Sequence, residues 1–432
     1  MTWQMVHEVV ASILLVTVLV LVIVRPFKLD IAWFTGIGAL VAIVCGLLPL
    51  TSLITIFGDT WDATITLIAL FLLAQALDSS GFFNWSALCL ARFARGSGWR
   101  LYGLMLLLTL AVVALLANDG AILMLTPIFA RLLKKIYPQE THRLPFFFAA
   151  GLFADAMSII FIPSNLTNII IADANQLNFL RFAAWMLLPT LSAFIVGGGA
   201  FALRFRQQIS ATYDVNILEE PSSVIVDRVM FTISWWALGI LALGYIVGNQ
   251  FHIPFSLVSG AIALTMLLLV QLRGLQSARV MFLKAPWSIL IYALSMFVVI
   301  TATYEAQVLG FLMNPLTLAV RSGLSGALAA GGIISILSSV VNNLPAVLVG
   351  VLALQKATHI SQTAIYAIVI GTNIGPKFTP FGSLATLLWL GILKDHDINI
   401  SWRTYMRENW WVVLLTLCAA FGGLCLSGLL FG

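Results

Sequence analysis

The chain contains 432 residues, of which 61% are hydrophobic and only 9% are charged, and its mean hydropathy is +1.04. These values exclude an ordinary soluble globule. The net charge of +5 does not indicate nucleic-acid binding, because the basic residues stand in short segments between apolar runs. Continuous apolar runs of this kind predict an all-α polytopic membrane protein.

About 10 runs have the length of roughly 20 residues that a membrane-spanning helix needs. We predict spans at 9–24, 31–49, 61–77, 144–172, 182–203, 231–249, 255–272, 287–303, 361–393 and 409–430, and hairpins at 100–135 and 324–356. No basic cluster precedes the first run, so we expect a retained helix and no cleaved signal peptide.

Polar residues interrupt both hairpins near their centres. The first interruption is Ala117-Asn118-Asp119-Gly120, and the second is Val341-Asn342-Asn343-Leu344-Pro345. The return arms, Ala121–Leu133 and Ala346–Leu354, are too short to cross a core of about 30 Å, so we predict re-entrant hairpins. Full crossings by thinned arms remain an alternative, because either version returns to the same side.

Similar interruptions occur in two of the predicted spans. Pro163-Ser164-Asn165-Leu166-Thr167-Asn168 breaks the span at 144–172, and Gly371–Pro380 breaks the span at 361–393. Hydrocarbon contains no water, so non-helical backbone survives there only around a protein-lined cavity. Paired interruptions in two halves of a chain are typical of secondary transporters and indicate the substrate site.

The order of these elements occurs twice along the chain. Each half has three spans, an amphipathic segment (Phe82–Arg95 or Gln307–Arg321), a hairpin, an interrupted helix and a closing span. An odd number of crossings in each half makes the two repeats inverted. We predict a first repeat at 1–206, a cytoplasmic linker at 207–228 and a second repeat at 229–432. In this pairing Asn118 matches Asn342, and Asn165 matches Asn373.

The positive charges predict the orientation. If the N-terminus faces outward, most of the 22 lysines and arginines lie on the cytoplasmic side. Arg181, Arg321 and Lys356 then lie outside, and Lys377 lies inside the membrane. Both termini are therefore expected on the outer side.

Several runs resemble the bacterial arsenite/antimonite efflux permease family. They are Ser79–Phe83, Leu116–Ala121, Ser338–Pro345, Gly375–Lys377 and Thr379–Trp389. The resemblance implies the ion-transporter superfamily fold, a location in the bacterial inner membrane, and export of arsenious acid and antimonite in exchange for protons by alternating access. It also implies, for some members, docking to a cytosolic arsenite-stimulated ATPase.

One departure from the family pattern concerns Thr372-Asn373, where the family often has Cys-Asp. The missing thiol and carboxylate argue against thiolate coordination at this point. Neutral arsenious acid offers three hydroxyls that donate and accept hydrogen bonds, so amides and hydroxyls are suitable ligands. The candidate substrate-binding residues are Asn118, Ser164, Asn165, Thr167, Asn168, Asn342, Asn343, Thr372, Asn373 and Lys377. Each of the Asn, Ser and Thr residues has an alternative role as a cap of a half-helix.

Charged residues inside the membrane are the candidates for proton coupling. Each costs about 2.5–3.5 kcal/mol at a helix centre on insertion scales, so its presence indicates function. We expect Asp119 and Lys377, from opposite repeats, to form the coupling pair, with Asp155 as the next proton carrier. The alternative is a structural ion pair that merely pins the first hairpin to the second broken helix.

Cysteine and histidine do not predict a metal or metalloid site. The four cysteines stand singly in apolar runs and the five histidines are scattered through loops. We therefore expect no thiolate site, no metal cluster and no cofactor. Two other functions stay open: a sodium-coupled anion carrier or sodium/proton antiporter of the same fold, and an intramembrane enzyme using Asp119 and Asp155. The enzyme is disfavoured, because no hydrolytic motif accompanies the two acids.

Overall fold

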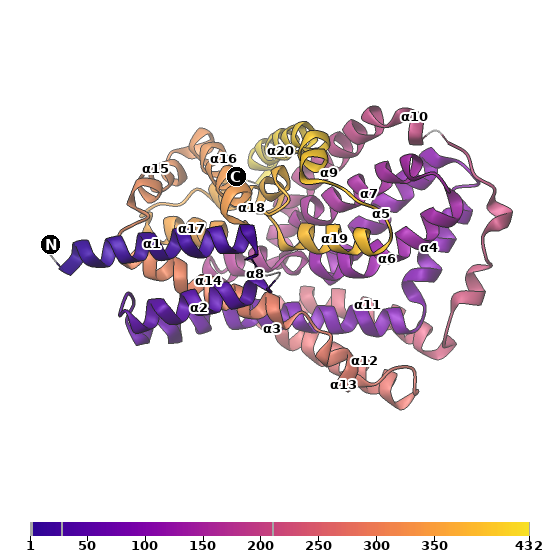
Figure 1. Ribbon diagram of the computed structural model, residues 1–432, viewed down its shortest axis with the longest axis horizontal. Coiled ribbons are helices and arrows are strands. Elements are labelled where there is room, and N and C mark those ends of the chain that lie inside the picture. Colours follow the sequence, from indigo (N-terminus) through magenta and orange to yellow (C-terminus); the bar gives the residue numbers. More distant parts are fainter. Residues whose placement is uncertain (1–2, 27–28, 210, 432) are drawn as a thin grey trace.

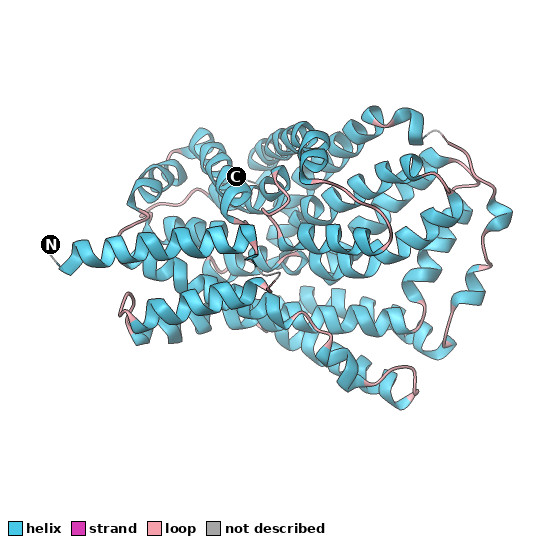
Figure 2. Cartoon of the chain, viewed as in Figure 1, coloured by secondary structure: helices cyan, strands magenta, loops and turns pink. Residues whose placement is uncertain are grey.

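The computed structural model describes residues 3–26, 29–209 and 211–431, and within these residues it contains helices and no named strand (Figure 2). Ten of the described helices are long and apolar enough to cross a membrane. The prediction of an all-α polytopic membrane protein is thereby confirmed.

The first half contains the following helices: α1 (Trp3–Val24), α2 (Ile31–Val44), α3 (Leu50–Ser79), α4 (Phe82–Phe93), α5 (Gly98–Leu116), α6 (Asn118–Ile136), α7 (Glu140–Ala156), α8 (Leu166–Ala174) and α9 (Phe179–Arg204). Helices α5 and α6 form the first hairpin. Helices α7 and α8 form the first broken helix, and two short 3₁₀ turns, η2 (Met157–Ile160) and η3 (Ile162–Ser164), join them.

The linker contains α10 (Arg206–Ile209), η4 (Val215–Ile217) and η5 (Pro221–Val224). The second half continues with α11 (Arg228–Gln250), α12 (Phe255–Leu272), α13 (Ala278–Leu283), α14 (Trp287–Glu305), α15 (Gly310–Arg321), α16 (Gly323–Val341), α17 (Asn343–Lys356), α18 (Gln362–Ile374), η6 (Gly375–Phe378), α19 (Leu384–Asp395) and α20 (Trp402–Phe431). Helices α16 and α17 form the second hairpin, and α18 and α19 form the second broken helix.

Packing between the halves follows the same repeat. Helix α3 packs against α12, and their counterparts α14 and α2 pack against each other; α9 and α20, also counterparts, lie side by side. Reciprocal pairs of this kind are what a two-fold relation between the halves produces. The amphipathic segments are the helices α4 and α15, which lie at opposite ends of the long axis (Figure 1). This placement agrees with repeats of opposite orientation.

The hairpins differ from the sequence-based prediction in the length of their return arms. Helix α6 has 19 residues and starts at Asn118, and α17 has 14 residues and starts at Asn343. The predicted arms began three residues later, because we treated the polar residues as helix breakers. Asn and Asp are instead favourable in and before the first turn of a helix. The first arms, α5 and α16, are long enough to cross a membrane, so re-entry stays a prediction.

Each hairpin turns at a single residue with a positive φ. These residues are Ala117 (φ 60°, ψ 161°) and Asn342 (φ 86°, ψ 157°). Ala117 is therefore the counterpart of Asn342, and Asn118 is the counterpart of Asn343. The predicted match of Asn118 with Asn342 is wrong by one position.

The broken helices also align differently from the prediction. Asp155 and Asn373 are each the last but one residue of a helix that ends at a break, and Asn165 and Ser383 are the N-cap residues of α8 and α19. The predicted match of Asn165 with Asn373 is therefore wrong. The prediction paired residues of the same type, whereas the backbone pairs residues at the same place in a break.

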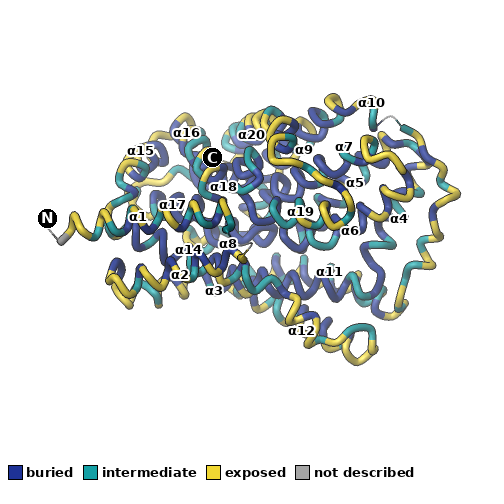
Figure 3. Tube along the Cα trace, viewed as in Figure 1, coloured by how far each residue is buried: buried dark blue, intermediate teal, exposed yellow. Residues whose placement is uncertain are grey.

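The broken helices lie in the interior (Figure 3). By contrast, α1, α11 and α12 carry exposed apolar side chains such as Val16 (60% exposed), Trp236 (68%) and Leu264 (62%). Such faces are what lipid would cover. The polar residues of the breaks are therefore surrounded by protein.

Candidate functional site

The two broken helices meet through four buried side chains, Ser158, Asn165, Asn168 and Asn373, which we call the asparagine cluster. Asn373 Oδ1 accepts hydrogen bonds from Asn165 Nδ2 (2.7 Å) and Ser158 Oγ (2.7 Å). Asn373 Nδ2 donates to Asn168 Oδ1 (2.8 Å). The cluster thus joins the break after α7 to the end of α18.

The same side chains form hydrogen bonds with backbone groups that have no helical partner at the breaks. Asn165 Oδ1 accepts from the N–H of Thr167 (3.1 Å) and so caps α8. Asn168 Nδ2 donates to the carbonyls of Ser158 (2.7 Å) and Phe161 (3.0 Å). A buried carbonyl without a partner is costly, so these bonds hold the broken segment in one conformation. The alternative role as a cap holds for Asn165.

The second hairpin is tied to the second break. Asn342 Oδ1 accepts from the N–H of Leu344 (3.3 Å), and Asn342 Nδ2 donates to the carbonyl of Phe381 (3.2 Å). The N–H of Asn343 donates to the carbonyl of Gly382 (3.0 Å). Asn342 is therefore also a cap, and the hairpin tip and the break form one unit.

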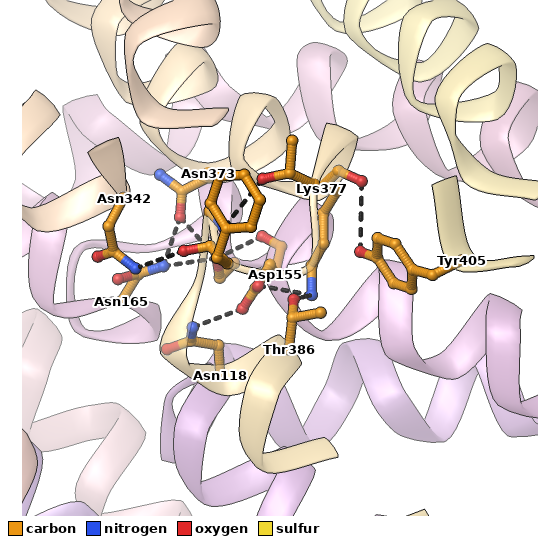
Figure 4. Close-up of polar contacts among 12 residues, drawn as sticks. Asn118, Asp155, Asn165, Asn342, Asn373, Lys377, Thr386 and Tyr405 are labelled. Carbon is orange, nitrogen blue, oxygen red and sulfur yellow. Dashed lines mark hydrogen bonds and ion pairs between the residues drawn. The ribbon is translucent and has the colours of Figure 1, made fainter. Parts of the chain in front are cut away.

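A buried ion pair lies beside the asparagine cluster (Figure 4). Lys377 Nζ is 2.6 Å from Asp155 Oδ2, and the two side chains are 1% and 2% exposed. Lys377 Nζ also donates to Thr386 Oγ1 (2.7 Å), and Asn118 Nδ2 donates to Asp155 Oδ1 (2.6 Å). Tyr405 OH donates to the carbonyl of Lys377 (3.3 Å). Groups from both halves therefore surround one carboxylate and one ammonium.

The expected pairing of Lys377 with Asp119 is wrong, because the partner of Lys377 is Asp155. Asp119 is buried in the first turn of α6, close enough to Asp155 and Lys377 to interact with both electrostatically. A carboxylate in the first turn of a helix is stabilised by the helix dipole. Asp119 is therefore a second buried acid in the same region, and its part in proton coupling stays a prediction.

Some polar side chains near the breaks bind backbone, and others have an atom without a hydrogen-bond partner. Ser164 Oγ donates to the carbonyl of Ala114 (3.3 Å), and Thr372 Oγ1 donates to that of Val369 (3.0 Å), so both bind backbone. Three other buried polar atoms in this region have no hydrogen-bond partner: Asn118 Oδ1, Thr167 Oγ1 and Ser383 Oγ. Native proteins rarely leave such atoms unpaired, and a bound ligand is one explanation.

Ser158, Thr386 and Ser383 were missed by the sequence-based reasoning. Ser383 and Thr386 lie within a run that carries the family resemblance, Thr379–Trp389, and follow a break by only a few residues. The available signal was their place shortly after the predicted interruption Gly371–Pro380, where a helix resumes. Ser158 precedes the predicted polar run, and the actual break begins before it, at Met157.

A cavity of about 430 Å³ lies on one side of these breaks. Its walls come from α3, α8, α14, α17 and the turn between α11 and α12. Its polar or titratable lining residues include Asp62, Asp173, Asn178, His252 and Gln355. The α8 wall begins at Ile170, one turn or about 6 Å along the helix from its start at Leu166.

Within the described residues, no group of three or more His, Cys, Asp or Glu side chains is arranged to hold a metal ion. Cys45 and Cys418 are exposed, and Cys89 and Cys425 are half-buried. The cysteines do not belong to the asparagine cluster or to the ion pair. Transport without thiolate ligands stays a prediction.

The chain matches the family model described as arsenical pump membrane protein over residues 9–427. The chain belongs to this family. An arsenical pump membrane protein of Yersinia enterocolitica is 38% identical over 417 residues, covering 95% of this chain and 96% of that protein. A relative of the same name from Escherichia coli is 36% identical with the same coverage. The family confirms the predicted resemblance and makes this chain a bacterial multi-pass membrane protein of arsenical transport, not an enzyme.

A solved structure, that of the Alcanivorax borkumensis YdaH transporter, has a similar fold. The TM-score is 0.50 with 13% sequence identity, and 87% of each chain is covered. At this identity the likeness concerns the fold alone.

Proposed function

We propose that the chain exports trivalent arsenite and antimonite from the cytoplasm in exchange for protons by alternating access. The observation that carries this proposal is the buried pair Asp155–Lys377. It joins the end of α7 in the first half to the break after α18 in the second half. An exchange mechanism needs a group that can change its proton content as the halves move.

Buried charges are stable only while they are paired and hydrogen-bonded. A movement that separates Asp155 from Lys377 would leave both charges unbalanced. In the separated state a substrate hydroxyl could donate to the charged carboxylate of Asp155, and uptake of a proton by Asp155 would remove that acceptor. Proton binding and arsenite release would then be coupled through one pair. Asp119, in the same region, is a second carboxylate that could take part.

The pair also favours protons over sodium as the coupling ion. Asp155 Oδ1 accepts from Asn118, and Asp155 Oδ2 contacts Lys377. Both carboxylate oxygens are thus occupied, and the ammonium already supplies the positive charge that a sodium ion would bring. In the sodium-coupled alternative, the ammonium of Lys377 would have to move away from Asp155 to make room for a sodium ion.

Hydrogen bonding, not thiolate coordination, is proposed to hold the substrate. The unpartnered atoms Asn118 Oδ1, Thr167 Oγ1 and Ser383 Oγ lie where half-helices begin. Arsenious acid has hydroxyls that can donate to all three atoms and accept from the hydroxyls of Thr167 and Ser383. The asparagine cluster is proposed to shape the site and to hold the two breaks in their conformation.

Alternating access is supported by the position of the cavity. The cavity reaches α8 and α17. It does not reach their counterparts in the opposite repeat, α19 and α6. With both termini outside, as the charges predict, the turn between α11 and α12 faces outward, and so does the cavity. Re-entrant hairpins that enter from opposite faces would place both tips near the midplane. The conformation is then open to the outside and closed to the cytoplasm.

The test is uptake of trivalent arsenic into everted membrane vesicles. An acid-inside gradient is expected to drive uptake with and without sodium. Asp155→Asn and Asp119→Asn should lose gradient-driven uptake, and Lys377→Ala should lose binding as well. Glu305→Gln changes an exposed carboxylate at the end of α14 and should behave like the wild type. Uptake that needs sodium, or that ignores the proton gradient, would contradict the proposal.

A further inference from the structure

The two broken helices are not equivalent at the start of their second parts. Helices α8 and α19 begin at matching positions, after Asn165 and Ser383. Asn165 caps α8, because its Oδ1 accepts from the N–H of Thr167. Ser383 has the extended backbone of an N-cap residue (φ −138°, ψ 137°), but its side chain makes no cap hydrogen bond. The N-terminus of α19 is therefore uncapped.

The hydroxyl of Ser383 is buried and unpaired. The residue is 1% exposed, and its Oγ has no hydrogen-bond partner. Serine at an N-cap usually accepts from a backbone N–H of the first turn, and losing that bond is unfavourable. A helix start without a cap, next to a buried hydroxyl without a hydrogen-bond partner, is expected where a bound ligand makes the hydrogen bonds that a cap would make.

A strong donor, Lys377 of η6, is bound to the first turn of α19. Thr386 is the third residue of α19, and its Oγ1 accepts from Lys377 Nζ. An N-cap residue and the third residue after it are neighbours in space. An ammonium has three N–H donors, and the hydrogen bond to Thr386 and the ion pair with Asp155 use two of them. The helix start and the ammonium are both positive, so this position favours electron-rich oxygen.

We propose that Ser383, the first turn of α19 and the free N–H of Lys377 form the subsite that receives a small trihydroxy acid such as arsenious acid. The hydroxyl of Ser383 exchanges hydrogen bonds with one ligand hydroxyl, and the N–H groups donate to ligand oxygens. The asparagine cluster at the start of α8 is internally bonded and serves as the frame. This inference rests on the proposed function, and it identifies a residue that directly contacts the substrate.

The subsite also belongs to the loading step. Helix α19 packs against α6, and both helices end in segments predicted to be cytoplasmic. The cavity lies on the opposite side, along α8 and α17. Separation of α6 from α19 would therefore open Ser383 to the cytoplasm, from which the substrate comes.

The test compares Ser383→Ala with Ser338→Ala in the purified full-length protein. Ser338 is also buried, but its hydroxyl donates to the carbonyls of Gly371 (3.0 Å) and Ser335 (3.1 Å). Arsenite is the probe, and the readouts are thermal unfolding without ligand and arsenite affinity from the ligand-induced shift. Ser383→Ala should unfold at the wild-type temperature or higher, and should bind arsenite roughly fivefold to tenfold more weakly. Ser338→Ala should show the reverse, with lower stability and unchanged affinity.

Wild-type affinity in Ser383→Ala would overturn the inference and leave the proposed function intact. A loss of stability in Ser383→Ala with unchanged affinity would show that the hydroxyl is a structural cap. Ser383→Thr, which keeps the hydroxyl, should retain more affinity than Ser383→Ala. If the wild-type protein itself gives no response to arsenite, the proposed function fails, and this inference fails with it.

Discussion

Replacing Asp155 by Asn removes one charge of the buried pair and keeps the size of the side chain. The new amide oxygen can still accept from Asn118, so the change isolates the charge. Lys377 is then 1% exposed without its counter-ion at 2.6 Å. Breaking a buried pair by removing one partner costs about 3–5 kcal/mol, whereas replacing both partners by neutral groups is often neutral or stabilising. We expect Asp155→Asn to cost about 3–5 kcal/mol and Asp155→Asn/Lys377→Met to recover most of it.

The assay is a double-mutant cycle by thermal and denaturant unfolding in detergent, using both single variants and the double variant. Proton-driven arsenite uptake is measured in vesicles in parallel. The double variant should be stable and yet fail to couple uptake to the proton gradient. A cost below about 1 kcal/mol for Asp155→Asn, the range of an exposed pair, would refute the reasoning that the pair is desolvated. Coupled uptake by the double variant would remove the pair from the mechanism.

Three further predictions concern groups outside the ion pair. Replacing all four cysteines by Ala should leave arsenite uptake largely intact, because none of them belongs to the polar site; loss of uptake in a folded variant would show thiolate chemistry. Gly81→Ala should destabilise the protein by more than the roughly 1–2 kcal/mol of a left-handed backbone, because φ is +86° and a Cβ would also lie 2.1 Å from a linker carbonyl oxygen. Thermal unfolding measures this, and Gly103→Ala, in open space, should not destabilise the protein. The backbone N–H of Met230 and the guanidinium of Arg273 lower the pKa of Asp227 at the start of α11. The difference in unfolding free energy between the wild type and Asp227→Asn should therefore be largest above the unfolded pKa of Asp227 and disappear as pH falls through the lower folded pKa. A difference that does not change with pH would contradict this.

The class of protein and the segments that carry its site followed from the sequence. Apolar runs of this length form helices in lipid, because a helix satisfies its own backbone hydrogen bonds. Polar interruptions in such runs must face protein. Asn118, Asn165, Asn168, Asn373, Asp155 and Lys377 were therefore identifiable as residues of one buried region. The intramembrane charges were identifiable for the same reason, because lipid does not tolerate an unpaired ion. The long motifs then indicated the family.

Which groups touch was decided by the tertiary structure. Asp119 and Asp155 are both acids next to polar interruptions, and only the packing of α7 against α18 and η6 decides that Asp155 meets Lys377. The match between halves depended on backbone conformation, so residue identity misled when it paired Asn165 with Asn373. Whether Asn165 or Ser383 caps its helix depends on where one side-chain oxygen points. Asn and Ser can each bond to several groups, and only the packing of the folded chain decides which of those groups lies within hydrogen-bond distance.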